Sequence, residues 1–308
     1  MSRRRVVVTG MGIVSPVGST IDSAWDAICN GRSGIRTVAE FDASHMKTRI
    51  AGEVTGFDVS DYLSPREAKR FDDFVHYGFA ASVDALQDSG LLDEDSNHDP
   101  ERVGCAVGSG IGGLKTIEAT TEAYLKGGPR KVSPFFIPGS IINMIGGHLS
   151  IVYNLKGPNL AIVTACSTAT HNIGSAARMI QHGEADVMVA GGAEYATTPT
   201  SLSGFISARA MSTRNDEPEK ASRPWDEDRD GFVLSNGAGV IVLEELQHAR
   251  QRGATIYGEV IGFGMSADAY HMTAPPDDGE GAGRCMRVAL KDAGIAPQDV
   301  DYINAHGT

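Results

Sequence analysis

The chain has 308 residues, of which 41% are hydrophobic, and its formal net charge is −12. This acidic balance argues against nucleic-acid binding, and the hydrophobic content is enough for a sizeable core. The four cysteines have neither zinc-site nor disulfide-framework spacing, and Met1 to Arg5 lead into a strand pattern without a signal-peptide core. The most apolar stretch, Phe135–Tyr153, is interrupted by Pro138, Asn143 and His148, so no membrane span is expected. These features predict a cytoplasmic protein in a reducing compartment.

Strand and helix patterns alternate along the chain, which is typical of an α/β protein. Asn236-Gly237, between apolar Phe232–Leu234 and Val240–Leu243, predicts a two-residue hairpin. Strands are predicted at Val6–Val8, Val103–Val107, Leu160–Thr164, Val187–Ala190, Gly239–Leu243, Tyr257–Gly262 and Tyr302–Asn304. Helices are predicted at Ile21–Asn30, Pro65–Asp88, Gly113–Leu125, Ile141–Ser150, Ile173–His182, Leu246–Arg252 and Gly283–Asp292.

Two distant stretches resemble each other, which indicates an internal duplication. Ala85–Leu91 and Ala289–Ile295 each end an amphipathic helix with glycine at a C-cap position, and a short loop and a strand follow. The first copy continues for more than a hundred residues, whereas the second reaches only His306. We therefore expect an N-terminal half, residues 1–252, and the start of a similar second half, residues 253–308. By analogy with the first half, we expect a complete protein to continue for on the order of 100 residues.

Cys166 is the leading candidate for a nucleophile. It follows Ala161–Ala165, which is predicted to be a short buried strand, and precedes the helical pattern of Ser175–His182. At such a turn a thiol meets the positive end of the helix dipole and unpaired backbone N–H groups, which favour the thiolate and can stabilise an oxyanion. The setting indicates acyl transfer through a cysteine thioester. Most free cysteines are inert core residues, and that interpretation is kept for Cys29, Cys105 and Cys285.

A second candidate, His306, lies in a loop after the strand-like start of Asp301–Thr308. Thr164-Ala165-Cys166, with His171–Gly174 downstream, resembles the nucleophile turn of the β-ketoacyl-[acyl-carrier-protein] synthases, and Asn304–Thr308 resembles the loop with their first catalytic histidine. Ala169 stands where the family often has glycine. Further stretches that resemble the family are Val6–Gly12, Ser15–Gly18, Gly108–Gly113, Ala190–Glu194, Ser212–Asn215, Arg223–Asp226, Asp230–Val233 and Asp268–Thr273.

The resemblance covers the whole chain and is strongest to the elongating condensing enzymes of bacterial type II fatty-acid synthesis. It implies a thiolase-like fold of duplicated βα halves in layers, with the second half truncated at Thr308, before the family's lysine and second histidine. It also implies decarboxylative condensation of an acyl thioester with malonyl-[acyl-carrier-protein], with Cys166 as the acylated nucleophile and His306 as a donor to the enolate. By the same resemblance Ile111 and Phe205 line the acyl pocket, and Thr273 and Thr308 contact the phosphopantetheine arm.

The resemblance also implies partners. No cofactor of the enzyme's own is required, because the phosphopantetheine is carried by the acyl carrier protein. A homodimer is implied, with Phe135–Tyr153 near the interface. Arg66, Lys69 and Arg70 fall at i, i+3, i+4 on one predicted helix, and such a face is otherwise ordinary solvated surface. The residues implied to receive the acidic carrier are Arg66, Lys69, Arg70, Arg130, Lys131 and Arg209.

Other functions stay open with less support. A polyketide-type ketosynthase would share the fold, as would a non-catalytic partner subunit, although such subunits usually lack the cysteine that is present here. A degradative thiolase would use coenzyme A, and the match around His306 argues against it. Gly108–Gly113 fits the dinucleotide-binding pattern, but no acidic residue follows near Gly127–Arg130, where that site needs one.

Overall fold

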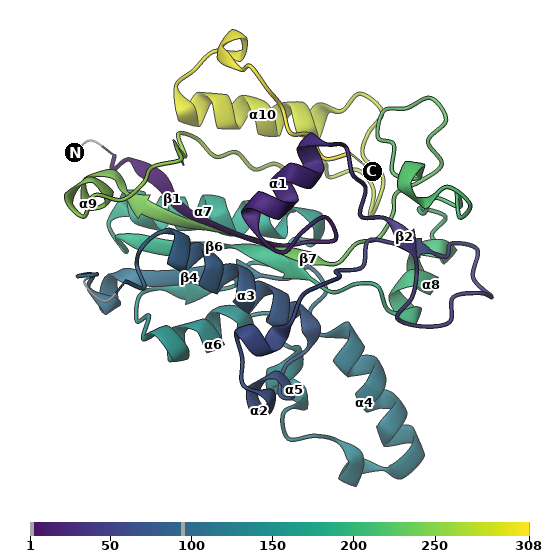
Figure 1. Cartoon of the computed structure of the whole chain (residues 1–308). Coiled ribbons are helices and arrows are strands. Elements are labelled where there is room, and N and C mark those ends of the chain that lie inside the picture. Colours follow the sequence, from purple (N-terminus) through teal and green to yellow (C-terminus); the bar gives the residue numbers. More distant parts are fainter. Residues whose placement is uncertain (1–2, 94–95, 308) are drawn as a thin grey trace.

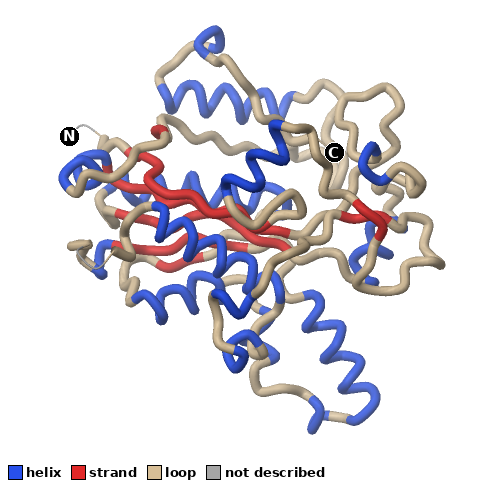
Figure 2. Tube along the Cα trace, viewed as in Figure 1, coloured by secondary structure: helices blue, strands red, loops and turns tan. Residues whose placement is uncertain are grey.

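The structure is a computed structural model that describes residues 3–93 and 96–307. Its centre is a six-stranded mixed sheet in the order β5-β4-β6-β7-β1-β8, seen edge-on as the red strands of Figure 2. β5, β4 and β6 run parallel, and the pairs β6–β7, β7–β1 and β1–β8 are antiparallel. The strands of this sheet are β1 (Val6–Val14), β4 (Val103–Gly108), β5 (Asn159–Leu160), β6 (Val187–Glu194), β7 (Gly237–Glu245) and β8 (Gly258–Glu259); β2 (Arg36–Thr37) and β3 (Ile50–Ala51) form a separate pair.

Helices cover both faces of the sheet (Figure 1). On one face, α3 (Asp73–Asp88) and α6 (Met144–Tyr153) bury a cluster that includes Phe74 and Phe79. On the other face, α7 (Thr168–His182) buries Ile180 against the sheet. α10 (Glu280–Ala293) lies beyond α7, because residues 262–264 contact both helices. The remaining α-helices are α1 (Ile21–Cys29), α2 (Pro65–Ala68), α4 (Leu114–Gly127), α5 (Phe136–Ser140), α8 (Pro199–Ser207) and α9 (Leu246–Gln251).

The α/β prediction is confirmed, and most predicted elements lie within a few residues of observed ones. The short helices α5 and α8 were not predicted. The predicted division at residues 252 and 253 stays a prediction. Among the described residues, no helix is long and apolar enough to span a membrane. Short 3-10 helices complete the secondary structure at Val59–Asp61, Pro100–Arg102, Pro129–Lys131, Ala165–Ser167, Pro218–Lys220 and Pro297–Asp299.

The predicted single helix Pro65–Asp88 is wrong, because the chain breaks between α2 and α3. α2 ends at Ala68, and Asp72 caps α3 by accepting a hydrogen bond from the Phe74 N–H at 3.3 Å. The same buried carboxylate accepts a 2.7 Å hydrogen bond from the Thr116 N–H in the first turn of α4. One aspartate therefore fixes the starts of two helices, and the break removes the single basic helix face expected from the sequence.

Four predicted strand or hairpin features are also wrong or shortened. Leu160–Thr164 pairs only through Leu160, and Tyr257–Gly262 is reduced to β8, with backbone hydrogen bonds from the flanking Tyr257 and Val260 to β1. Residues 302–304 form no strand within the described chain. No hairpin forms at Asn236-Gly237, because Gly237 begins β7 and the buried Asn236 side chain accepts hydrogen bonds from the N–H groups of Ala196 and Thr197 at 2.9 and 3.1 Å.

Candidate active site

A cavity of about 630 Å³ opens at one edge of the central sheet. β4 and β6 end at this edge because they are parallel, and β7 begins there because it is antiparallel to β6, with Glu194 opposite Gly237. The turn before α7 and the loop with His306 complete the walls. Strand ends of this kind supply binding and catalytic groups from several segments at once. The residues that line the cavity include Ser109, Gly110, Ile111, Ala165, Cys166, Glu194, Phe205, Asn236 and His306.

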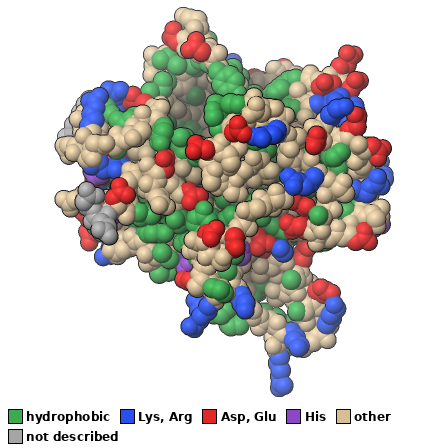
Figure 3. All heavy atoms as spheres, in the orientation of Figure 1, with side chains coloured by type: hydrophobic (Ala, Val, Ile, Leu, Met, Phe, Trp, Pro, Cys, Tyr) green, Lys and Arg blue, Asp and Glu red, His purple; other side chains and the backbone are tan. Residues whose placement is uncertain are grey.

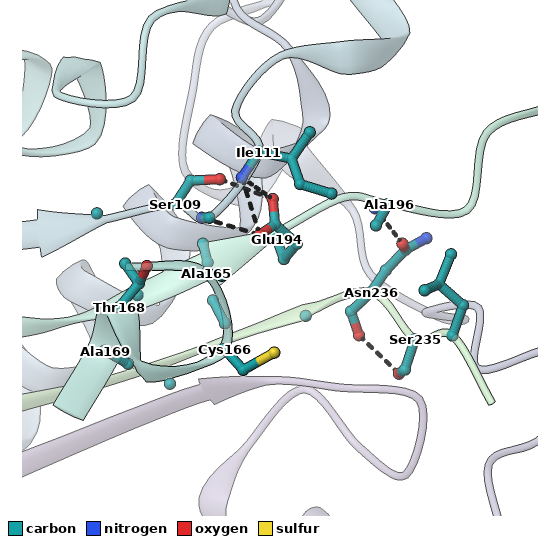
Figure 4. A pocket seen from close by; sticks show the side chains of 18 of the residues that line it. Ser109, Ile111, Ala165, Cys166, Thr168, Ala169, Glu194, Ala196, Ser235 and Asn236 are labelled. Atoms are coloured by element: carbon teal, nitrogen blue, oxygen red, sulfur yellow. Dashed lines mark hydrogen bonds between the residues drawn. The ribbon is translucent and has the colours of Figure 1, made fainter. Parts of the chain in front are cut away.

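Cys166 lies at the sharp turn that enters α7, and its sulfur points into the cavity (Figure 4). The Thr164 N–H donates to Thr168 Oγ1 at 2.9 Å, and the Ser167 hydroxyl donates to the Thr164 carbonyl at 2.8 Å. Ala165 has a left-handed φ of 51°, which is unusual for a residue with a Cβ and marks a strained turn next to Cys166. The predicted turn is therefore confirmed.

The buried strand predicted before Cys166 is wrong. Val163 through Cys166 are exposed, and the backbone of Ile162 bonds to a side chain and not to a neighbouring strand. The buried Asn172 amide accepts from the Ile162 N–H at 3.0 Å and donates to the Ile162 carbonyl at 3.1 Å. Side chains of α7 therefore replace the strand pairing and leave the cysteine open to the cavity.

The other cysteines have different surroundings. Cys105 is buried in β4, and burial raises the pKa of its thiol to about 12. Cys29 is exposed near the end of α1, away from the residues that line the cavity. Cys285 is half-buried in α10 and donates to the Gly264 carbonyl at 3.2 Å. Of the four, Cys166 is the one that lines the cavity.

His306 lines the same cavity although it lies far from Cys166 in the sequence. Its loop is held against the segment 213–230, since a Cβ at Gly307 would lie 2.7 Å from Pro224 and 2.9 Å from Trp225. Ile111 and Phe205 also line the cavity. Thr273 is exposed and is not among the lining residues, and Thr308 lies outside the described residues.

Glu194, at the end of β6, is a site residue that was quoted within a motif but given no role from the sequence. Its carboxylate accepts hydrogen bonds from the Ser109 hydroxyl at 2.7 Å and the Gly110 N–H at 2.9 Å (Figure 4). Burial raises the pKa of Glu194, and these hydrogen bonds act in the opposite direction. A charged residue that ends an otherwise apolar strand was the signal available in the sequence.

The basic residues expected to receive a carrier protein are spread over several segments. Arg66 and Lys69 are exposed on and just after α2, and Arg70 is half-buried, with its guanidinium 4.8 Å from the centre of the Phe135 ring. Arg130 and Lys131 are exposed in the 3-10 turn after α4. Arg209 is exposed beyond α8, with a left-handed φ of 55°.

Comparison with protein families decides which family this arrangement belongs to. The model "Beta-ketoacyl synthase, N-terminal domain" matches residues 3–249, and "Beta-ketoacyl synthase, C-terminal domain" matches residues 257–308. The chain belongs to the β-ketoacyl synthase family. A 3-oxoacyl-[acyl-carrier-protein] synthase 2 from Vibrio cholerae is 58% identical over 308 residues, which cover all of this chain and 74% of the relative.

Solved β-ketoacyl synthase structures agree with this assignment. A β-ketoacyl synthase from Burkholderia phymatum has a TM-score of 0.90 and 35% identity, over 99% of this chain and 74% of that one. A ketosynthase in complex with its type II polyketide acyl-carrier protein has a TM-score of 0.89 and 32% identity, with the same coverage. The thiolase-like ketosynthase fold expected from the resemblance is therefore confirmed.

Proposed function

We propose that this β-ketoacyl synthase is an acyltransferase that condenses an acyl thioester with malonyl-[acyl-carrier-protein] in fatty-acid elongation. The observation that carries the proposal is that Cys166 and His306 line one cavity together with the apolar side chains of Ile111 and Phe205. A nucleophile, a hydrogen-bond donor and an apolar wall are the three groups that this condensation needs. The greater identity to the synthase 2 relative than to the polyketide ketosynthase favours the fatty-acid pathway over the polyketide one.

In the first stage the Cys166 sulfur attacks the carbonyl carbon of the acyl thioester. The carbonyl oxygen takes the negative charge, and backbone N–H groups at the start of α7 can stabilise it. The intermediate collapses, the carrier thiol leaves with a proton, and the acyl group stays on Cys166 as a new thioester. The apolar wall then holds the acyl chain away from water.

In the second stage malonyl carrier protein occupies the cavity and loses carbon dioxide. The electron pair of the broken carbon–carbon bond forms an enolate, whose oxygen accepts a hydrogen bond from His306 Nε2. The enolate carbon attacks the acyl carbonyl, and the Cys166 thiolate leaves. The products are a β-ketoacyl carrier protein and carbon dioxide. No electrons are gained or lost overall, so this scheme uses no redox cofactor, and the phosphopantetheine belongs to the carrier.

An acidic acyl carrier protein is the proposed partner. Basic side chains gather over the lower projection of the molecule in Figure 3, where Figure 1 shows α2, α4 and α5. Arg66, Lys69, Arg130 and Lys131 are exposed there. Against a net charge of −12 these residues supply local positive potential for an acidic partner. Arg70 and Arg209 complete the proposed set, and Thr273 and Thr308 are proposed to contact the arm of the carrier.

A second copy of the chain is the other proposed partner. β5 is an edge strand of the sheet, and α4 has no buried residue although it contains Ile117, Tyr124 and Leu125. Leu125 and Ile151 are 77% and 76% exposed, which is unusual for large apolar side chains. A homodimer formed through β5 and this apolar surface would cover both, and sedimentation should give twice the mass of the chain. Four free cysteines support the cytoplasm as the proposed location.

The test of the condensation is a mass measurement on the protein. Incubation with an acyl carrier thioester should add one acyl mass to the peptide that contains Cys166, and later addition of malonyl carrier protein should remove it and release β-ketoacyl product. The Cys166→Ala variant should gain no acyl mass, whereas Cys29→Ala should behave as the unchanged protein. An acyl group on another residue, or product formation by Cys166→Ala, would overturn the proposal.

A further inference from the structure

The carboxylate of Glu194 accepts hydrogen bonds from the backbone of the loop that carries Ile111. Gly110 N–H donates to Glu194 Oε2 at 2.9 Å, and Ile111 N–H lies 3.2 and 3.3 Å from the two carboxylate oxygens. The Ser109 hydroxyl donates to Glu194 Oε1 at 2.7 Å and itself accepts from the Gly112 N–H at 2.9 Å. Three consecutive backbone N–H groups thus depend on one side chain, two directly and one through Ser109.

This loop also touches the turn that carries the nucleophile. A Cβ at Gly110 would lie 2.7 Å from Glu194 Oε2 and 3.2 Å from the Ala165 carbonyl oxygen, so the Gly110 backbone is held between the two. Ala165 immediately precedes Cys166 and is the residue with the left-handed backbone. Figure 4 shows Glu194 between Ser109 and Ile111, with Ala165 and Cys166 alongside. The loop with Ile111 is therefore placed relative to the nucleophile turn by Glu194.

The hydrogen bonds also decide what the cavity wall presents to a ligand. All three donors to Glu194 are neutral, and they occupy both of its oxygens. Unpaired N–H groups on this wall would bind water, which an acyl chain would have to displace at a cost. Because these donors are hydrogen-bonded to Glu194, the wall presents the Ile111 side chain and a backbone whose N–H groups already have partners.

We infer that Glu194 is a positioning residue for acyl-chain selection, which holds the Ile111 loop so that the pocket accepts long acyl groups. The inference rests on the proposed function. Glu194 acts through Ser109, Gly110 and Ile111 and not by contact with the reacting atoms. Loss of its carboxylate should therefore change which acyl chains reach Cys166, more than it changes the reactivity of the thiol itself.

The experiment compares Glu194→Gln with the unchanged full-length protein. A glutamine presents an NH₂ group toward N–H donors and can no longer accept from all of them. We expect acylation of Cys166 by a long-chain carrier thioester to fall about tenfold relative to a short-chain one. Alkylation of Cys166 by iodoacetamide, which needs no acyl pocket, should change less than about threefold. Glu118→Gln is the matched control, because Glu118 also accepts hydrogen bonds from a hydroxyl and an N–H, at Thr198 and Thr200, and is not among the cavity residues.

A milder variant keeps the test decisive if Glu194→Gln does not fold. Ser109→Ala removes only the hydroxyl that accepts a hydrogen bond from the Gly112 N–H and donates one to Glu194. It should shift the ratio of long-chain to short-chain acylation of Cys166 in the same direction, about threefold. An unchanged ratio in the folded variants would overturn the inference, and so would an equal shift in Glu118→Gln. Equal loss of both acyl donors together with slow alkylation would also overturn it, because Glu194 would then serve the nucleophile turn. If the unchanged protein takes no acyl group at all, the proposed function has failed.

Discussion

Arg252 donates two hydrogen bonds of 2.7 Å to the fully buried Glu244, one to each carboxylate oxygen. The Thr9 hydroxyl and the His248 ring are the other partners of this carboxylate. Burial alone would raise the pKa of Glu244, but hydrogen bonds from Arg252 and His248 outweigh it and lower the pKa. The charged form of a central-strand residue thus depends on a side chain from the start of the following loop.

Removal of that partner should be costly. Arg252→Ala leaves an uncompensated buried carboxylate, and we expect a loss of about 3–5 kcal/mol in the free energy of unfolding. The measurement is the denaturant midpoint, with Arg250→Ala as control, because Arg250 is exposed in α9, which ends just before Arg252. A similar loss in both variants would show that the ion pair is not responsible.

Asp186 should make stability depend on acidic pH. Hydrogen bonds, first from Arg102 and also from Arg4, lower the pKa of this half-buried carboxyl to about 2, from an ordinary value of 3.8. Because the folded pKa is below the unfolded one, its contribution is complete above the unfolded value and is lost as pH falls toward 2. We expect the melting temperature of the unchanged protein to drop toward that of Asp186→Asn over this window. The exposed Asp216→Asn variant should follow the unchanged protein at every pH.

Cys166 should be the most reactive thiol in the folded protein. It is exposed just before α7, at the positive end of the helix dipole, whereas Cys29 is exposed at the last residue of α1, the negative end. We expect iodoacetamide to label Cys166 at least about tenfold faster than Cys29, with Cys285 slower and buried Cys105 unlabelled. Peptide mass mapping over time measures this order. In denaturant the four rates should converge, and equal labelling in the folded state would contradict the prediction.

Ile111→Trp should narrow the cavity. A larger side chain at this wall would block long acyl groups while short ones still reach Cys166, so the rate ratio should change by about tenfold or more. Ile256→Trp is the matched control, because Ile256 has nearly the same exposure, 40% against 42%, and is not a lining residue. Acyl-enzyme mass spectra with short and long donors provide the measurement. Equal loss with both donors would point to misfolding.

Charge reversal at Arg66 and Lys69 should weaken the use of carrier-bound substrates. Both residues are exposed, whereas Arg70 packs on Phe135, so the pair can be changed without disturbing that contact. We expect the apparent KM for acyl carrier protein to rise about tenfold, with less effect on acyl-coenzyme A, and added salt should reproduce the difference. Reversal of exposed Lys47 and Lys220 tests whether net charge alone is enough. If neither salt nor reversal separates the two substrate forms, Arg66 and Lys69 are ordinary surface.

Local sequence patterns predicted those elements whose hydrogen bonds are local or repeated along a strand. α1 and α7 have clear helical periodicity, and β4 is a continuous apolar run. β6 extends beyond its predicted end at Ala190 because Gly191 stays in the strand: a Cβ there would lie 2.2 Å from the Gly239 carbonyl oxygen. That close approach to β7 depends on a partner that a local pattern does not reveal.

Errors occurred where a side chain of another element hydrogen-bonds a backbone group that the local pattern assigned to a strand. Ile162 and Val163 have good strand propensity, yet the Asn172 side chain forms hydrogen bonds with both the N–H and the carbonyl of Ile162. The meeting of Cys166 and His306 was expected from family resemblance, since no spacing rule joins residues so far apart. Glu194 could have been noticed as a charge at the end of an apolar strand, but its partners became visible only when β4 and β6 were paired.

α4 connects two regions whose roles are proposed separately. The helix is 14 residues long, or about 21 Å, with the Ile111 loop directly before it and Arg130 directly after it. Asp72 ties its first turn to α3, which lies on the sheet, while its far end has no buried residue to hold it. We therefore expect a partner bound at the basic far end to act on the Ile111 loop through this helix, whose first turn is fixed by Asp72.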